Sequence, residues 1–123
     1  MSEPATILVA DDVSANRTLF SVYLRKTYAV ETVATAEEAQ ARIAAGGVDL
    51  ALLDINYGGG MSGVDLIREL RSDPATADVR AVALTAHASP EDRATYLAAG
   101  FDGYLSKPVM KAEMLAAVAE HLG

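Results

Sequence analysis

The chain of 123 residues is long enough to bury the core of one ordinary domain but too short for two. Half of its residues are hydrophobic and fewer than a quarter are charged, which excludes a disordered protein. The lack of cysteine excludes disulfides and thiolate metal sites, and the net charge of −7 argues against binding nucleic acid. No apolar run approaches the roughly 20 residues of a membrane span, and none resembles a signal peptide, so we expect a cytoplasmic location.

The first part of the chain predicts two strands separated by a helix. Residues 6–10 (TILVA) are a short apolar run, partly β-branched, which is typical of a buried strand. Residues 14–26 follow with apolar side chains at a helical spacing. Residues 30–33 are a second candidate strand. Thr35 and Glu38 then form a capping box, which opens a second helix.

The strongest strand signal lies at residues 48–55 (VDLALLDI), after the second helix has ended at Gly46 and Gly47. The run is apolar except for two aspartates, as expected for a central strand that is buried on both faces. The remaining elements are a helix at 64–73, a strand at 80–85, a helix at 89–100, a strand at 103–105 and a helix at 115–122. Five strand–helix pairs predict a doubly wound (βα)5 fold of the α/β class, with a parallel sheet between helices.

Polar residues stand where four of these strands end. They are Asp11 and Asp12 after the first strand, Asp54 in the third, Thr85 in the fourth and Lys107 after the fifth. Ligands of such sheets bind beyond the carboxyl ends of the strands, so we expect these residues to meet at one rim. Three carboxylates would repel one another there unless a cation holds them together, and a site made of oxygen ligands suits Mg²⁺.

The same rim suits a phosphoryl group. Lys107 and Thr85 add a positive charge and a hydroxyl donor, which favour an anion that arrives and departs. A carboxylate can itself be the nucleophile that receives this group. Asp54 is the best candidate, because it closes the most buried strand and can present its side chain between the metal and the lysine.

Four short motifs occur along the chain in the order ILVADD, LLDI, LTA and GYLSKP. Together they resemble the bacterial two-component response-regulator receiver domain, over essentially the whole chain. The resemblance implies one receiver domain over residues 1–123, with a flavodoxin-like sheet of five parallel strands in the order 2-1-3-4-5. It is closest to the stand-alone, single-domain type found in phosphorelays, and Met1 with the end at Gly123 favours a whole protein.

The resemblance also implies roles for the residues of the rim. Asp12 and Asp54 would bind Mg²⁺ directly, together with the backbone carbonyl of Asn56, while Asp11 would act through a bound water. Asp54 would accept the phosphoryl group, and Lys107 would pair with one of its oxygens.

Other residues would respond to that group or control its lifetime. Thr85 would swing inward to hydrogen-bond a second phosphoryl oxygen, and Tyr104 would rotate inward with it. Asn56 and His87 occupy the positions that tune how long the aspartyl phosphate survives. The peptide bond before Pro108 is expected to be cis.

The loop after the acceptor departs from the family pattern. Gly58 stands where many members have a proline, and the glycine that usually follows comes one residue later, at Gly63. We therefore expect an insertion, a more flexible loop and an altered surface for kinase docking. The glycines of this loop lack the Gly-Lys-Ser/Thr that completes a nucleotide-binding P-loop, so that function is rejected.

By the same resemblance, the phosphoryl donor is a phosphohistidine on a histidine kinase or a histidine phosphotransfer protein. Output would pass to a downstream protein effector by contact, or by onward phosphotransfer, without direct nucleic-acid binding or membrane insertion. Thr85 and Tyr104 would couple the site to the surface of the last two helices and the strand between them. We expect a monomer or a weak phosphorylation-dependent dimer, which is no enzyme beyond catalysing its own phosphorylation and dephosphorylation.

Two alternatives stay open. A Mg²⁺-dependent aspartyl-phosphate phosphohydrolase of the haloacid dehalogenase group needs Asp-x-Asp after the first strand, whereas this chain has adjacent aspartates there and no cap segment. A receiver-like scaffold that no longer responds to phosphate is the second alternative. The intact Asp54, Thr85 and Lys107 argue against it.

Overall fold

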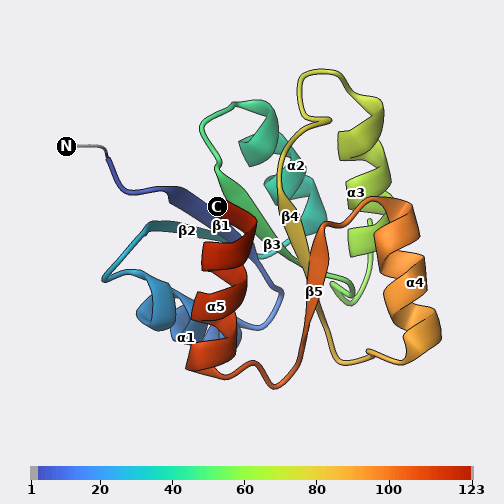
Figure 1. Ribbon diagram of the computed structural model, residues 1–123. Helices are drawn as coiled ribbons and strands as arrows, with labels where there is room; N and C mark the ends of the chain where they lie inside the picture. Colours follow the sequence, from blue (N-terminus) through green and yellow to red (C-terminus); the bar gives the residue numbers. More distant parts are fainter. Residues whose placement is uncertain (1–2, 123) are drawn as a thin grey trace.

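The structure is a computed structural model that describes residues 3–122, with a five-stranded parallel sheet between helices (Figure 1). The strand order β2-β1-β3-β4-β5 confirms the predicted topology. The strands are β1 (Thr6–Ala10), β2 (Ala29–Val33), β3 (Leu50–Asp54), β4 (Ala81–Thr85) and β5 (Gly103–Ser106). The helices are α1 (Ser14–Leu24), α2 (Ala36–Ala44), α3 (Gly63–Ser72), α4 (Pro90–Ala99) and α5 (Lys111–Leu122).

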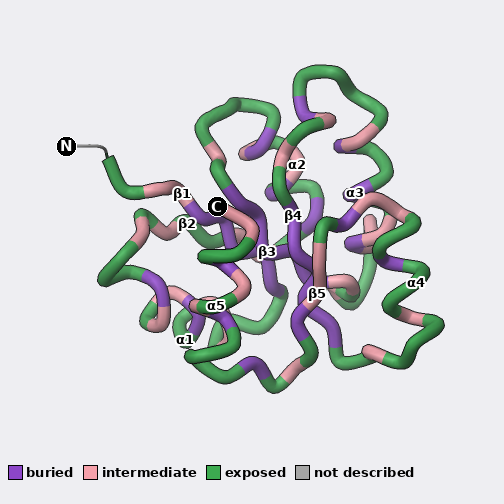
Figure 2. Tube along the Cα trace, in the orientation of Figure 1, coloured by how far each residue is buried: buried purple, intermediate pink, exposed green. Residues whose placement is uncertain are grey.

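The central strands divide their side chains between two apolar cores. Leu8 and Leu53 lie in the core covered by α2, α3 and α4, whereas Ile7 and Leu52 lie in the core covered by α1 and α5. Because successive side chains of a strand point to opposite faces, a strand that is covered on both sides must be apolar throughout. Figure 2 shows β3 and β4 buried along their length, which confirms the prediction of a doubly covered central strand.

The elements differ from their predicted ranges mainly at the edge of the sheet and at helix ends. The edge strand β2 pairs with β1, and each of its residues is exposed or half-buried. Helix α5 begins at Lys111, one turn before Leu115, the first apolar residue from which the final helix was predicted. The turn still contributes Met114, which is fully buried.

Side-chain caps fix where three of the helices begin. Thr35 accepts a hydrogen bond from the backbone of Glu38 at the start of α2, which is one half of the predicted capping box. The Glu38 carboxylate accepts from the N–H of Ala34 instead of the N–H of Thr35. Ser89 makes a complete capping box at the start of α4, and Ser62 makes another at the start of α3. These caps satisfy backbone groups that would otherwise lack partners, so each loop enters its helix at a defined residue. Within residues 3–122, no helix is long and apolar enough to cross a membrane.

Candidate functional site

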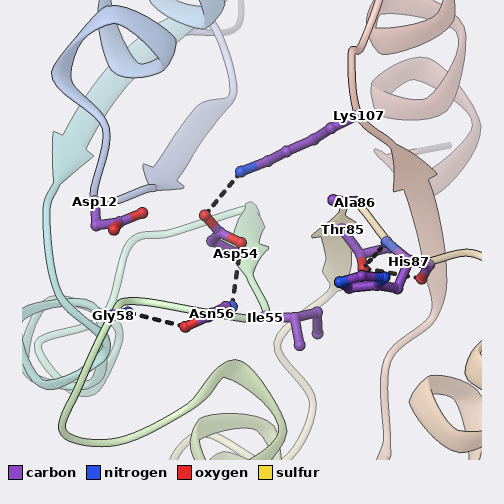
Figure 3. A pocket seen from close by; sticks show the side chains of 9 residues that line it. All are labelled: Asp12, Asp54, Ile55, Asn56, Gly58, Thr85, Ala86, His87 and Lys107. Carbon is purple, nitrogen blue, oxygen red and sulfur yellow. Dashed lines mark hydrogen bonds and ion pairs between the residues drawn. The ribbon is translucent and has the colours of Figure 1, made fainter.

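The carboxyl ends of the strands bring residues that are far apart in the sequence to one cavity (Figure 3). The cavity is lined by Asp12, Asp54, Ile55, Asn56, Gly58, Thr85, Ala86, His87 and Lys107. Parallel pairing of β1, β3, β4 and β5 places the ends of these strands at the same edge. The predicted convergence at one rim is therefore present in the structure.

Three carboxylates gather beside this cavity. Asp11, Asp12 and Asp54 each offer an oxygen within 4.8 Å of the others. Asp11 is fully buried and Asp54 is 5% exposed, whereas Asp12 is exposed to solvent. An open cluster of hard oxygen donors fits the ligand preference of Mg²⁺, which keeps several waters and takes few protein ligands.

Lys107 supplies the positive charge of the cluster. Its Nζ lies 2.8 Å from Asp54 Oδ2 and 2.9 Å from Asp11 Oδ2, so one ammonium group joins two carboxylates. Lys107 precedes Pro108, and the bond between them is cis, as the resemblance predicted. The side chain reaches inward from the end of β5 to the end of β3 (Figure 3).

Burial and charge shift the proton affinities of this pair. Burial raises the pKa of Asp54 above its usual range, although the hydrogen bond and the charge of Lys107 act in the opposite direction. Burial also disfavours the charge on Lys107, but the hydrogen bonds that Lys107 donates to Asp54 and Asp11, together with the charges of these carboxylates, outweigh it and raise the pKa of the ammonium group. Lys107 therefore stays protonated at neutral pH, and burial disfavours the negative charge on Asp54 despite this partner.

Asp11 is held in place by several donors. The backbone N–H of Val13 donates to Oδ1 at 2.9 Å, and Asn16 Nδ2 lies 3.3 and 3.4 Å from the two oxygens. Arg17 donates to the backbone carbonyl of Asp11 at 2.8 Å. With Lys107 on Oδ2, both oxygens of this buried carboxylate are engaged. Asn16 and Arg17 could have been expected near Asp11 from the sequence, because both follow the acidic pair within a few residues.

Thr85 lies at the cavity, but its hydroxyl is engaged on the side away from Asp54. Oγ1 accepts from the backbone N–H of His87 at 2.9 Å and lies 2.9 Å from the His87 carbonyl oxygen. It also lies 3.0 Å from the hydroxyl of Tyr96, which is buried on α4. Thr85 and His87 were expected at this site from the sequence, whereas Tyr96 was not, because in the sequence it looks like one more apolar position of a helix.

Tyr104 does not line the cavity with the other predicted residues. It is half-buried on β5, and the guanidinium carbon of Arg93 lies 5.0 Å from the centre of its ring. Arg93 also donates to the backbone carbonyl of Ala88, so its position over the ring is fixed. In this structure, Tyr104 is thus packed under a side chain of α4.

The loop after Asp54 is attached at several points. The N–H of Asn56 donates to Asp54 Oδ1 at 3.2 Å, and the side chain of Asn56 accepts from the N–H of Gly58 at 2.9 Å (Figure 3). Further along, the N–H of Met61 donates to Glu37 of α2 at 3.2 Å. The Asn56 side chain is therefore directed into the loop rather than across the cavity, and Glu37 anchors the loop from a helix that sequence analysis did not connect with the site.

Gly63 closes the loop directly behind the acceptor strand. Its N–H donates to the carbonyl oxygen of Ile55 at 2.8 Å. A Cβ atom at this position would lie 2.2 Å from the backbone oxygen of Asp54, which leaves no room for a side chain. Residues 55–62 thus form the loop between β3 and the close approach of Gly63 to the backbone of Asp54, and the expected insertion in this loop stays a prediction. The greater flexibility expected of the loop stays a prediction.

Comparison with known proteins identifies one family. The family described as the response regulator receiver domain matches residues 7–119. The two-component response regulator PhoP of Pseudomonas aeruginosa is 36% identical over 88% of this chain, which spans 47% of that relative. An uncharacterized 14.6 kDa protein of Leptolyngbya boryana is 36% identical over 94% of this chain and 88% of its own length. The chain thus spans about half the length of PhoP and nearly the whole length of the second relative.

Solved structures show the same similarity. The chemotaxis protein CheY4 of Vibrio cholerae superposes with a TM-score of 0.88 at 28% identity, over 96% of this chain and 98% of its own. The receiver domain of the sensor histidine kinase PA1611 of Pseudomonas aeruginosa superposes with a TM-score of 0.88 at 30% identity. That comparison covers 99% of both chains, and the PA1611 structure has a magnesium ion coordinated in its active-site cleft.

Proposed function

Because the chain belongs to the response regulator receiver domain family, we propose that it is a phosphorylation-dependent signalling switch whose phosphoacceptor is Asp54. Receiver domains are signalling domains of two-component systems rather than conventional enzymes. We further propose that residues 1–123 act as a single receiver domain. The observation that carries the proposal is that Asp54 belongs to the acidic cluster, is paired with Lys107 and lines an open cavity.

The proposed reaction transfers a phosphoryl group from a phosphohistidine to Asp54. A carboxylate oxygen of Asp54 attacks phosphorus and forms an O–P bond. The P–N bond breaks at the same time, and its electron pair leaves with the imidazole nitrogen of the donor. Lys107 is positioned to pair with a phosphoryl oxygen, since its Nζ already lies 2.8 Å from Asp54. The Thr85 hydroxyl would donate to another oxygen.

The residues of the cavity fit a Mg²⁺ cofactor. Asp12 and Asp54 would hold the ion directly with the backbone carbonyl of Asn56, and Asp11 would act through a water, since both of its oxygens already have donors. When bound, the ion would offset the negative charge that the phosphoryl oxygens bring to three carboxylates. The magnesium ion in the cleft of the PA1611 receiver domain supports this assignment.

The proposed donor is a histidine kinase or a histidine phosphotransfer protein, and the receiver of the signal is a downstream protein. Output would pass through protein–protein contact or onward phosphotransfer, with no direct contact to nucleic acid. We propose a monomer or a weak dimer that forms on phosphorylation. The cytoplasm stays the expected location of this exchange.

A mass measurement with a small phosphodonor tests the function. The wild type and Asp54→Asn are incubated with acetyl phosphate and Mg²⁺, and the intact masses are compared. We expect an Mg²⁺-dependent phosphoryl adduct on the wild type that is lost in Asp54→Asn. The matched control is Asp78→Asn, which removes an exposed carboxylate from the loop before β4 and should keep the adduct.

The other outcomes would support the alternative functions. Rapid turnover of acetyl phosphate with release of free phosphate would favour the phosphohydrolase. A wild type that takes up no phosphoryl group would favour the scaffold. An adduct that persists in Asp54→Asn would place the acceptor elsewhere and contradict the proposal.

A further inference from the structure

Tyr96 makes a hydrogen bond that fixes the direction of the Thr85 hydroxyl. The two hydroxyl oxygens lie 3.0 Å apart, and both side chains are buried. Both hydroxyls also lie within hydrogen-bond distance of one acceptor, the carbonyl oxygen of His87, at 2.9 Å from Thr85 and 3.1 Å from Tyr96. The N–H of His87 completes the group by donating to Thr85 at 2.9 Å.

The hydrogen-bonding capacity of Thr85 is used up within this group. A hydroxyl has one proton to donate and two lone pairs that accept. One lone pair of Thr85 takes the N–H of His87, and its single proton goes either to the His87 carbonyl or to Tyr96. No proton is left for a phosphoryl oxygen on Asp54. Thr85 must therefore leave its partners before it can stabilise a phosphoryl group.

Tyr96 cannot follow Thr85, because its ring is held in the core. Within Pro90–Ala99, which the structure describes completely, Tyr96 is the one buried residue. Its ring packs edge-on against Phe101, with ring centres 6.5 Å apart and planes at 86°. The hydroxyl of Tyr96 is thus a fixed partner, and the hydrogen bond breaks when Thr85 moves towards Asp54.

We propose that Tyr96 is a positioning residue that acts through Thr85 and restrains phosphoryl transfer to Asp54. The inference rests on the proposed function of Asp54 as phosphoacceptor. The Thr85–Tyr96 hydrogen bond stabilises the arrangement in which Thr85 is turned away, so only a fraction of the molecules can react. Because the observed rate is proportional to the competent fraction, weakening this bond should speed phosphorylation. Through this hydrogen bond, the buried side chain of Tyr96 also connects α4 to the reaction site.

The variant Tyr96→Phe tests the inference with little change in packing. It keeps the ring against Phe101 and removes the hydroxyl. One neutral hydrogen bond corresponds to about a fivefold change in an equilibrium constant, so we expect the rate of adduct formation from acetyl phosphate to rise by up to about fivefold. In a Thr85→Val background, which lacks the partner hydroxyl, Tyr96→Phe should leave the rate unchanged.

Controls separate positioning from a structural effect. Tyr28→Phe alters a tyrosine just before β2, at the opposite edge of the sheet, and should not change the rate. Thermal unfolding midpoints are measured for every variant. An unchanged rate in Tyr96→Phe, or an equal increase with and without the Thr85 hydroxyl, would overturn the inference while leaving Asp54 as the acceptor. A wild type without an Asp54-dependent adduct would overturn both.

Discussion

At the scale of single residues, the site combines a buried acid pair with one cation. Lys107 contacts Asp54 and Asp11 at nearly equal distances, so the ammonium group neutralises neither carboxylate completely. Removing one partner of such a buried group leaves uncompensated charge, which is far more costly than losing a surface ion pair. The remaining negative charge of the cluster therefore favours binding of a cation from solution, as the proposed Mg²⁺ site requires.

The side chain of His87 at the mouth of the cavity can be removed without loss of the backbone hydrogen bonds of this residue. Its backbone N–H and carbonyl hold Thr85 and Tyr96, whereas its side chain is exposed and lines the cavity. His87→Ala therefore keeps the backbone contacts and removes only the imidazole. Because a smaller side chain gives water easier access to the aspartyl phosphate, we expect its half-life to shorten severalfold. The rate of adduct formation from acetyl phosphate should change much less.

Decay of the isolated phosphoprotein after removal of the donor measures this half-life. His121→Ala is the matched control, because His121 is the other histidine of the chain and its ring lies against Gly103 at the far end of β5. Equal half-lives for the wild type and His87→Ala would show that the side chain has no influence on hydrolysis.

At the scale of elements, local patterns predicted most of the architecture. The apolar run at 48–55 and the cap at Thr35 are short-range signals. The run contains β3, and Thr35 caps α2 with its side chain, although the return hydrogen bond of the predicted capping box is replaced by one from the N–H of Ala34 to Glu38. The start of α5 at Lys111 was not predicted, because the range was based on the apolar residues from Leu115 onwards and left out the turn that holds the buried Met114. The connection between Glu37 and Met61 could not be predicted, since it depends on how α2 packs beside an unusual loop.

Gly63, the first residue of α3, lies where a side chain would collide with the backbone of the acceptor strand. In Gly63→Ala the added Cβ would meet the backbone of Asp54 and Ile55, at 2.2 and 2.8 Å, and backbone atoms cannot move aside cheaply. We expect the free energy of unfolding to fall by about 3 kcal/mol, as for other strongly overpacked sites. Urea denaturation monitored by circular dichroism measures this loss.

Gly59→Ala in the same loop is the matched control. A Cβ at Gly59 would have no atom within 4 Å, and its backbone does not need the left-handed region. We expect a change of less than about 0.5 kcal/mol for this variant. Similar stabilities for the two variants would show that α3 can shift away from the acceptor strand.

At the scale of the whole molecule, Mg²⁺ binding at the acidic cluster should stabilise the folded state. The chain has a net charge of −7, and three carboxylates share one site. A ligand that binds only the folded state stabilises it by about 1.4 kcal/mol at ten times its Kd. For a domain of this size, that corresponds to a rise of roughly 5 °C in Tm. We expect Mg²⁺ to raise the Tm of the wild type and EDTA to reverse the effect, with a much smaller response in Asp54→Asn.

Without metal, the thermal stability of the protein should depend on pH. The pKa of Asp54 is raised by burial in the folded state, so the stability that its protonated form contributes is lost as pH rises through that pKa. Asp54→Asn should therefore be more stable than the metal-free wild type at pH 7, and the difference should shrink as pH falls to about 4. A wild type that is more stable than Asp54→Asn at pH 7 without metal would contradict this assignment.

The sequence by itself determined the order of the elements and the group of residues at the carboxyl edge. Apolar periodicity and helix caps are local properties, and parallel strands bring their ends to one edge wherever they lie in the chain. Only the tertiary structure decided where those side chains point. The Lys107 bridge, the Thr85–Tyr96 hydrogen bond and the position of Gly63 behind Asp54 join residues on different elements. Such contacts depend on how the helices pack against the sheet, which no short stretch of sequence encodes.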